Sequence, residues 1–188
     1  MSNFWHDIPP GPQPPEQVTA VIEIPSGSRN KYELDKVTGL LKLDRVLYSA
    51  VQYPGDYGFI PGTYAEDDDP LDILVLMNKA TFTGAVLRAR PLGILEMSDE
   101  KGRDQKILAV PVDDPRYDSN RHLESISRHR LREIEHFFRI YKELEGKHTN
   151  VEGWHGMDET HALIHTAVTT YKAKYPAGAN TPLDRRSS

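Results

Sequence analysis

The sequence of 188 residues contains no cysteine and no apolar run long enough to cross a membrane. Without cysteine, disulfide frameworks, thiolate metal sites and cysteine nucleophiles are all excluded. A membrane-spanning helix needs about 18 or more consecutive apolar residues, so no membrane partner is expected. The N-terminus also lacks the basic start and apolar stretch of a secretory signal. We therefore expect a cytoplasmic protein, which agrees with the absence of cysteine.

Positive charge is scarce as well. The 23 lysines and arginines are outnumbered by 28 aspartates and glutamates, which gives a formal net charge of −5 and a pI of about 5.9. Sequence-independent binding to nucleic acid requires a basic surface that displaces counterions, so no nucleic-acid partner is expected. The glycine-rich P-loop motif is also absent, so any phosphate would have to be bound in another way.

The length predicts one domain over residues 1–188. Residues 1–17 form a proline-rich arm, because five prolines between positions 8 and 15 exclude a helix there. Short apolar and β-branched segments, bounded by glycine and proline, then continue to about residue 112 and predict a closed or partly closed barrel. The expected strands cover residues 19–24, 31–34, 40–43, 73–77, 86–97 and 106–112. We expect residues 177–188 to form a loose tail.

Two helices are predicted after the strands, because the apolar residues there recur at helical spacing. The first is expected from about Ser127 to Glu145, where Gly146 stops it, and the second from about Asp158, its N-cap, to Lys174. The buried stripes would be Leu131, Ile134, Phe138 and Tyr141 in the first helix, and Leu163, Ala167, Val168 and Tyr171 in the second.

An acidic segment, Glu66 to Asp72, directly precedes the apolar run that starts at Ile73. It holds four aspartates, and like charges this close together repel one another unless solvent or a cation neutralises them. Carboxylate oxygens are the ligands that Mg²⁺, Mn²⁺ and Ca²⁺ prefer, so a metal site is one interpretation and a solvated turn is the other. An EF-hand loop is excluded, because Leu71 and Asn78 stand at its fifth and twelfth positions.

A second acidic group, Asp99, Glu100 and Asp104, surrounds Gly102. By itself this segment predicts a hairpin turn in which the glycine adopts a positive φ. A site for several metal ions needs carboxylates from more than one loop. The two acidic segments therefore support a metal site only in combination.

Cations and phenols that could bind phosphate are also present, but each has a structural explanation. Lys31 could pair with Glu33 on one face of a strand. Arg45 could form a salt bridge, and Lys142 could be a solvated helical lysine. The tyrosines of segment 53–57 could belong to the core, with their hydroxyl groups at its rim.

The histidines His161 and His165 lie four residues apart, as zinc ligands on a helix can. Ala162 occupies the position of the glutamate in an HExxH motif. Helix packing or a subunit contact is therefore the preferred interpretation of this pair.

Six segments between about Glu23 and Trp154 carry a specific combination of motifs. They are IEIPSGSRNKYE, DRVLYSAVQYPGDYGFIPGT, DDDPLDILVL, RARPLGILEMSDEKGRDQKILAV, HFFRIYKELE and VEGW. The pattern D-x-D-P-x-D with a downstream D-x(4)-D-x-K is highly specific. Together the segments resemble the family I soluble inorganic pyrophosphatases of bacteria and archaea. The resemblance implies an α+β, mainly β fold, in which two C-terminal α-helices flank an OB-like closed β-barrel.

The resemblance also implies hydrolysis of pyrophosphate to two phosphates by direct attack of a metal-activated water, without a covalent intermediate. Asp69 would accept or orient the proton of that water. The implied metal ligands are Asp67, Asp72, Asp99, Asp104 and Glu23; the implied phosphate-binding residues are Lys31, Arg45, Tyr57, Lys106, Tyr141 and Lys142; and Glu33 and Tyr53 would line the site.

The charges of this residue set explain why metal ions would be needed. Seven carboxylates and four cations leave a net charge of −3. Pyrophosphate adds up to about four negative charges, so about three or four Mg²⁺ ions would be required to restore neutrality. Mn²⁺ or Zn²⁺ are alternative ions.

The resemblance further implies a homohexamer. Asp68 departs from the family, in which Gly or Asn is frequent at this position, and its side chain is expected to point to solvent.

Three other functions stay open at this stage. An OB-type module for single strands or sugars would share the barrel, but it needs a basic, aromatic groove, which the acidic turns oppose. A calcium-binding or structural protein would leave Lys31, Arg45 and the Tyr141–Lys142 pair unexplained. A phosphohydrolase acting on nucleotides or phosphate esters is the hardest to exclude, although no base-stacking motif is evident.

Overall fold

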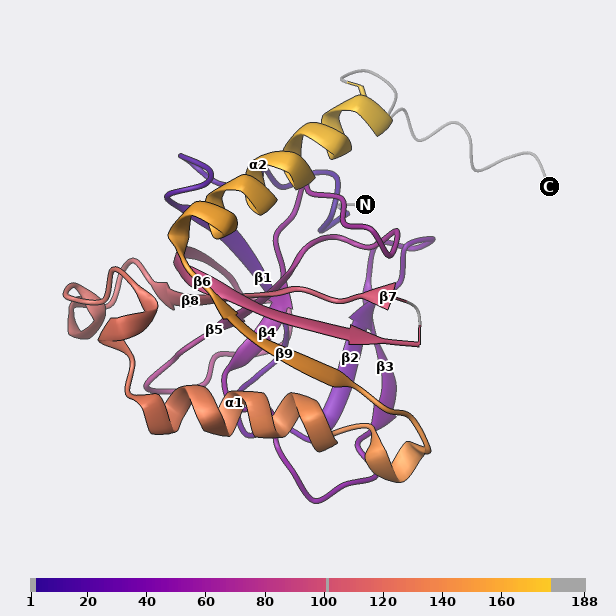
Figure 1. Ribbon diagram of the computed structural model, residues 1–188. Coiled ribbons are helices and arrows are strands. Elements are labelled where there is room, and N and C mark those ends of the chain that lie inside the picture. Colours follow the sequence, from indigo (N-terminus) through magenta and orange to yellow (C-terminus); the bar gives the residue numbers. More distant parts are fainter. Residues whose placement is uncertain (1–2, 101, 177–188) are drawn as a thin grey trace.

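The computed structural model describes residues 3–100 and 102–176, and the predicted tail at 177–188 lies outside them. Within this part of the chain, nine strands and two α-helices follow one another (Figure 1). The strands are β1 (Val18–Ile24), β2 (Asn30–Leu34), β3 (Leu41–Val46), β4 (Asp56–Phe59), β5 (Asp72–Val75), β6 (Val86–Asp99), β7 (Gly102–Arg103), β8 (Lys106–Pro111) and β9 (Asn150–His155). The helices are α1 (Arg128–Ile140) and α2 (Met157–Lys174), with short 3-10 helices at Pro115–Tyr117, Leu123–Ser125 and Glu143–Glu145.

Five of the strands close into a ring. β1 pairs antiparallel with both β4 and β6, and the circuit is completed by β4 with β5, β5 with β8 and β8 with β6. The β5–β8 pair is parallel. β9 extends the sheet beside β6, and β2 and β3 form a separate hairpin. The predicted mainly β fold with two flanking helices is confirmed.

Alternating side chains on these strands feed two apolar clusters. In β8, Leu108 and Val110 belong to the cluster that contains α1, whereas Ile107 and Ala109 belong to the cluster that contains α2. The two helices therefore cover different faces of the sheet, and Figure 1 shows them on opposite sides of it. Gly58 allows β1 and β4 to approach closely, because a Cβ atom there would overlap the carbonyl group of Val21.

The first helix is shorter than predicted. α1 ends at Ile140, and the chain reaches Gly146 through a 3-10 turn instead. Gly146 has φ 72°, which accounts for the predicted stop. Ser127 caps the start of α1 by accepting a hydrogen bond from the backbone of Arg130. Phe137 is buried although the predicted stripe omitted it, whereas Leu131 is only partly buried.

The second helix begins one residue earlier than predicted. Gly156, not Asp158, is the N-cap of α2. The buried side includes Thr160 and Ile164, while Leu163 and Tyr171 are half-buried. A threonine can be buried here because its hydroxyl group donates to the carbonyl oxygen of Gly156 at 2.6 Å. No helix in the described part of the chain is both long and apolar enough to cross a membrane.

Candidate active site

A cleft of about 470 Å³ opens among the loops that precede and follow the ring strands. Thirteen of the fourteen predicted site residues line it, all of them described: Glu23, Lys31, Glu33, Arg45, Tyr57, Asp67, Asp69, Asp72, Asp99, Asp104, Lys106, Tyr141 and Lys142. Tyr53 is the exception. It is buried behind the cleft, and its ring lies 5.3 Å from that of Tyr57 and 4.8 Å from that of Phe137.

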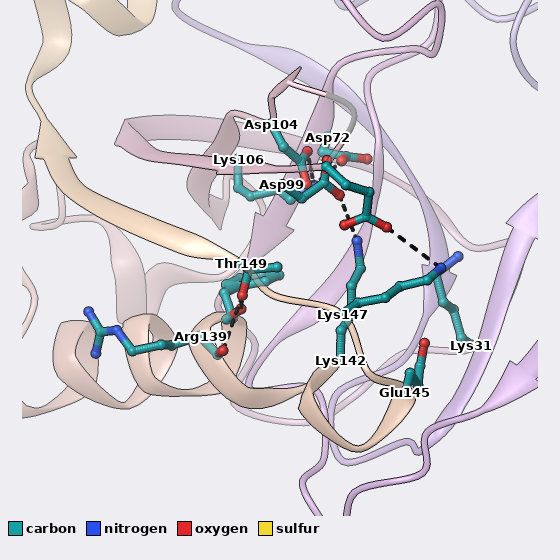
Figure 2. Close-up of polar contacts among 12 residues, drawn as sticks. Lys31, Asp72, Asp99, Asp104, Lys106, Arg139, Lys142, Glu145, Lys147 and Thr149 are labelled. Atoms are coloured by element: carbon teal, nitrogen blue, oxygen red, sulfur yellow. Dashed lines mark hydrogen bonds and ion pairs between the residues drawn. The ribbon is translucent and has the colours of Figure 1, made fainter.

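Strand register brings the central charges together. Asp72 at the start of β5 lies directly opposite Lys106 at the start of β8 in the parallel pair. Asp104 lies two residues before Lys106, in the turn after β7, and its backbone N–H donates to the carbonyl oxygen of Met97 at 2.8 Å. The ammonium group of Lys106 forms ion pairs with both Asp72 and Asp104. Figure 2 shows the three side chains gathered at one place.

Lys106 is a buried cation whose partners keep it charged. Only 4% of the residue is exposed, and its nitrogen lies 5.6 Å from the centre of the Tyr57 ring. Burial alone would lower the pKa of Lys106, but Asp72, Tyr57 and Asp104 raise it well above the ordinary value. The cleft therefore has a fixed positive charge at its base.

The carboxyl groups around Lys106, at the bottom of the cleft, resist full ionisation. Burial, together with the charges of Asp72 and Asp69, raises the pKa of Asp67 to about 6. Burial and the charge of Asp72 raise the pKa of Glu23 to about 8, although Glu23 accepts a hydrogen bond from the backbone N–H of Leu34 at 2.7 Å. The pKa of Asp72 is raised as well, chiefly by burial. An added cation would relieve all three groups.

Glu23 makes the stability of the metal-free protein depend on pH. Its pKa of about 8 in the folded state exceeds the 4.5 of an unperturbed glutamate, so the folded protein holds this proton more tightly. The stabilisation is complete below pH 4.5 and is lost as the pH rises through about 8. We expect this one group to lower the free energy of unfolding by up to about 5 kcal/mol over that range.

The matched variant is Glu23→Gln, whose amide oxygen can still accept the hydrogen bond from Leu34. Urea unfolding of both proteins in a chelator, at several pH values, isolates the contribution of Glu23. The difference in stability between them is expected to change steadily from pH 5 to pH 8. A constant difference would show that Glu23 does not titrate in this range.

The remaining cations of the predicted set are held by acidic partners at the rim. Lys31 lies 3.2 Å from Glu33 and 3.1 Å from Asp44, and Arg45 pairs with Asp44 and, at 2.9 Å, with Glu145. These contacts confirm the Lys31–Glu33 pair and the salt bridge expected for Arg45.

Lys142 follows the end of α1 and is not the solvated helical lysine that the sequence alone allowed. Its ammonium group lies 2.9 Å from the carboxylate of Asp99, and Figure 2 marks this ion pair with a dashed line. Burial alone would lower the pKa of Lys142, but Tyr141 and Asp99 raise it to about 12. The pKa of Tyr57 is raised well above the ordinary value and that of Tyr141 is also raised, in both cases mainly by burial. Both phenols are therefore neutral hydrogen-bond donors at neutral pH.

Several lining residues were not among the fourteen predicted site residues. They are Tyr32, Lys36, Asp44, Glu100, Arg103 and Lys147, together with the apolar Leu34, Phe59 and Pro70. Arg103 pairs with the buried carboxylate of Glu96 at 2.9 Å, and Lys36 pairs with Asp69. A lysine in a hairpin turn has no pattern that distinguishes it from a solvated one, so Lys36 could be found only from the fold.

The acidic loop between β4 and β5 bends at Asp68. This residue has φ 67°, a conformation that favours glycine or asparagine, so the backbone explains why those residues suit the position. The side chain is 77% exposed, as expected, but it also accepts a hydrogen bond from the hydroxyl group of Tyr64 and lies 3.7 Å from Lys174.

Within the described residues, no three or more His, Cys, Asp or Glu side chains are arranged so that they could hold a metal ion as they stand. His161 and His165 are therefore not part of such a group, and the Nε2 atom of His161 is buried without a hydrogen-bond partner among the described residues. In the acidic cleft, Asp72 and Asp104 are turned to Lys106 instead. The chemistry of the cleft nevertheless fits divalent cations, because crowded carboxylates with raised pKa values gain ionisation when a cation binds.

Comparisons with known proteins agree with one another. The family model described as inorganic pyrophosphatase matches residues 20–172. The inorganic pyrophosphatase of Synechocystis sp. is 53% identical over 155 residues, which is 82% of this chain and 92% of that protein. That of Picrophilus torridus is 45% identical over 170 residues, or 90% and 96% of the two chains.

A solved structure gives the same result. The crystal structure of the inorganic pyrophosphatase from Thermus thermophilus superposes with a TM-score of 0.88 at 44% identity, and the match covers 91% of this chain and 99% of that one. The matched segment contains every residue of the cleft described above. This chain therefore belongs to the inorganic pyrophosphatase family.

Proposed function

We propose that this protein hydrolyses inorganic pyrophosphate to two phosphates, with Mg²⁺ as its cofactor. The observation that carries the proposal is that carboxylates and cations together line one cleft. Carboxylates from the acidic loop and from the β6–β7 turn lie there beside lysines and an arginine from the β2–β3 hairpin, β8 and the end of α1. Carboxylates suit Mg²⁺, and the cations suit phosphate oxygens.

The charge of the cleft explains why metal ions are included. Among the described residues that line it, nine are carboxylates and seven are lysines or arginines, a formal charge of −2. Pyrophosphate would add up to about four negative charges in a partly buried space, where Coulomb repulsion is strong. About three to four Mg²⁺ ions with the substrate would offset these charges, and Mn²⁺ or Zn²⁺ could substitute.

The residues that would hold Mg²⁺ are the five carboxylates Asp67, Asp72, Asp99, Asp104 and Glu23. Two of them, Asp72 and Asp104, pair with Lys106, and the charges of both also act on Asp67. Magnesium, when bound, would supply charge neutralisation and a water of lowered pKa. With that positive charge supplied to Asp72 and Asp104, Lys106 would be available to contact a phosphate oxygen.

The other side chains bind the substrate and move the proton. Lys31, Arg45 and Lys142 would donate to the phosphate oxygens, and Tyr57 and Tyr141 would add neutral donors. Asp69, at the open side of the acidic loop, would accept the proton of the attacking water. These donors stabilise the charge that develops on the leaving phosphate, so no covalent intermediate is required. Glu33 pairs with Lys31, and Tyr53 supports the ring of Tyr57 from behind.

The substrate is tested by comparing initial rates of phosphate release from pyrophosphate, ATP and a phosphate monoester, each with Mg²⁺ at neutral pH. We expect rapid release from pyrophosphate and little from the other two, because cations distributed around the cleft can bind both phosphate groups of pyrophosphate. Preference for ATP or the ester would contradict pyrophosphate as the substrate but would leave the metal chemistry in place.

We also propose a cytoplasmic homohexamer, which sedimentation at several protein concentrations would test.

A further inference from the structure

Lys36 lies in the turn between β2 and β3 and reaches across the cleft to the acidic loop. Its ammonium group forms an ion pair with the carboxylate of Asp69 and donates to the carbonyl oxygen of Asp68 at 3.0 Å. One side chain from a separate two-stranded sheet therefore holds both the side chain and the backbone of this loop. None of the roles assigned above includes Lys36.

The N-terminal arm contacts Lys36 through the ring of Trp5. The ring of Trp5 is 3% exposed, and the nitrogen of Lys36 lies 5.9 Å from its centre. Trp5 is fixed in turn, because its indole N–H donates to the carbonyl oxygen of Thr63 at 2.8 Å. Asn3 packs beside Gly39 of the same hairpin turn, where a Cβ atom would lie 2.9 Å from the Asn3 side chain. The arm thus contacts both the hairpin and the loop.

Thr63 joins the two ends of the acidic loop. It is fully buried, and its hydroxyl oxygen accepts a hydrogen bond from the backbone of Leu71 at 2.9 Å. Within the loop, the backbone N–H of Ala65 donates to the carbonyl oxygen of Asp69 at 2.8 Å. The Asp69 side chain extends from this loop to the ammonium group of Lys36.

We propose that Lys36 is a positioning residue for Asp69, and that Trp5 of the N-terminal arm holds Lys36 in place. The inference rests on the proposed function, in which Asp69 accepts the proton of the attacking water. The side chains of Lys36 and Asp69 are 46% and 42% exposed, and ion pairs this exposed contribute little to stability. The contact therefore acts on geometry, and a misplaced carboxylate costs turnover more than folding.

The test compares Lys36→Met with Lys36→Arg and the wild type in the Mg²⁺-dependent hydrolysis of pyrophosphate. Methionine keeps the length of the side chain without its charge, and arginine restores the charge and the donors. Lys36→Met is expected to lower kcat by about 10- to 100-fold with KM nearly unchanged. Lys36→Arg is expected to recover most of the lost turnover, and the urea midpoints of all three proteins are expected to agree.

Lys172→Met is the matched control, because Lys172 is exposed on α2 and does not line the cleft. It is expected to match the wild type. Wild-type turnover by Lys36→Met would overturn the inference, and so would a rise in KM alone, which would make Lys36 a phosphate ligand. A lowered urea midpoint that accounts for the lost activity would overturn it too. An inactive wild type would instead refute the proposed function.

Discussion

Asp69→Asn is expected to lower kcat by about 10²–10⁴, the usual effect of removing a general base. The substitution keeps the shape of the side chain but removes its capacity to take a proton at neutral pH. Asp69 lies on the loop between Thr63 and Leu71, whose ends are tied together by a buried hydrogen bond, so the backbone should keep its position. Steady-state phosphate release from pyrophosphate, with saturating Mg²⁺, measures the effect.

Glu66→Gln is the control for this variant. Glu66 belongs to the same acidic loop and is exposed, but it does not line the cleft. The control makes the same chemical change a few residues away, and its kcat is expected to stay near that of the wild type. Near-normal turnover by Asp69→Asn would remove Asp69 from the role of proton acceptor.

Lys106→Met is expected to destabilise the metal-free protein by about 3–5 kcal/mol, since it removes one partner of a buried ion pair. Asp72 and Asp104 would then face each other at the base of the cleft without the cation that now pairs with both. Saturating Mg²⁺ is expected to reduce the difference, because the ion binds only the folded site and supplies the missing positive charge. Urea unfolding at neutral pH, with chelator and with Mg²⁺, gives both values.

Lys79→Met provides the comparison at an exposed lysine, where a change within about 0.5 kcal/mol is expected. A Lys106→Met protein as stable as the wild type in chelator would contradict the buried ion pairs. An equal loss of stability with and without Mg²⁺ would contradict the assignment of Asp72 and Asp104 as metal ligands.

Patterns in the sequence predicted much of this fold. The helical spacing after residue 127 and the apolar strands located both helices and most strands of the ring. β4 was missed, because the segment Asp56–Phe59 is rich in turn-forming and aromatic residues, and its pairing with β1 and β5 fixes it as a strand. β9 was missed for a related reason: only its pairing with β6 distinguishes it from an exposed loop.

The candidate site was predicted less from pattern than from resemblance. The acidic loop and the turn around Gly102 were visible as charge clusters, and Gly102 does adopt the expected positive φ, of 121°. Their convergence depends on the parallel β5–β8 pair, which places Asp72 opposite Lys106 across 34 residues of sequence. No local pattern encodes such a register, and for the same reason Lys36 and its contact with Asp69 were not foreseen.

The central claim is that this cleft hydrolyses pyrophosphate by using metal ions held by its carboxylates. The most direct measurement is the rate of phosphate release from pyrophosphate at neutral pH, first in chelator and then as Mg²⁺ is added. We predict negligible release without a divalent cation and rapid release once Mg²⁺ saturates. Full activity in chelator, or none with Mg²⁺ from a folded protein that binds the metal, would contradict it.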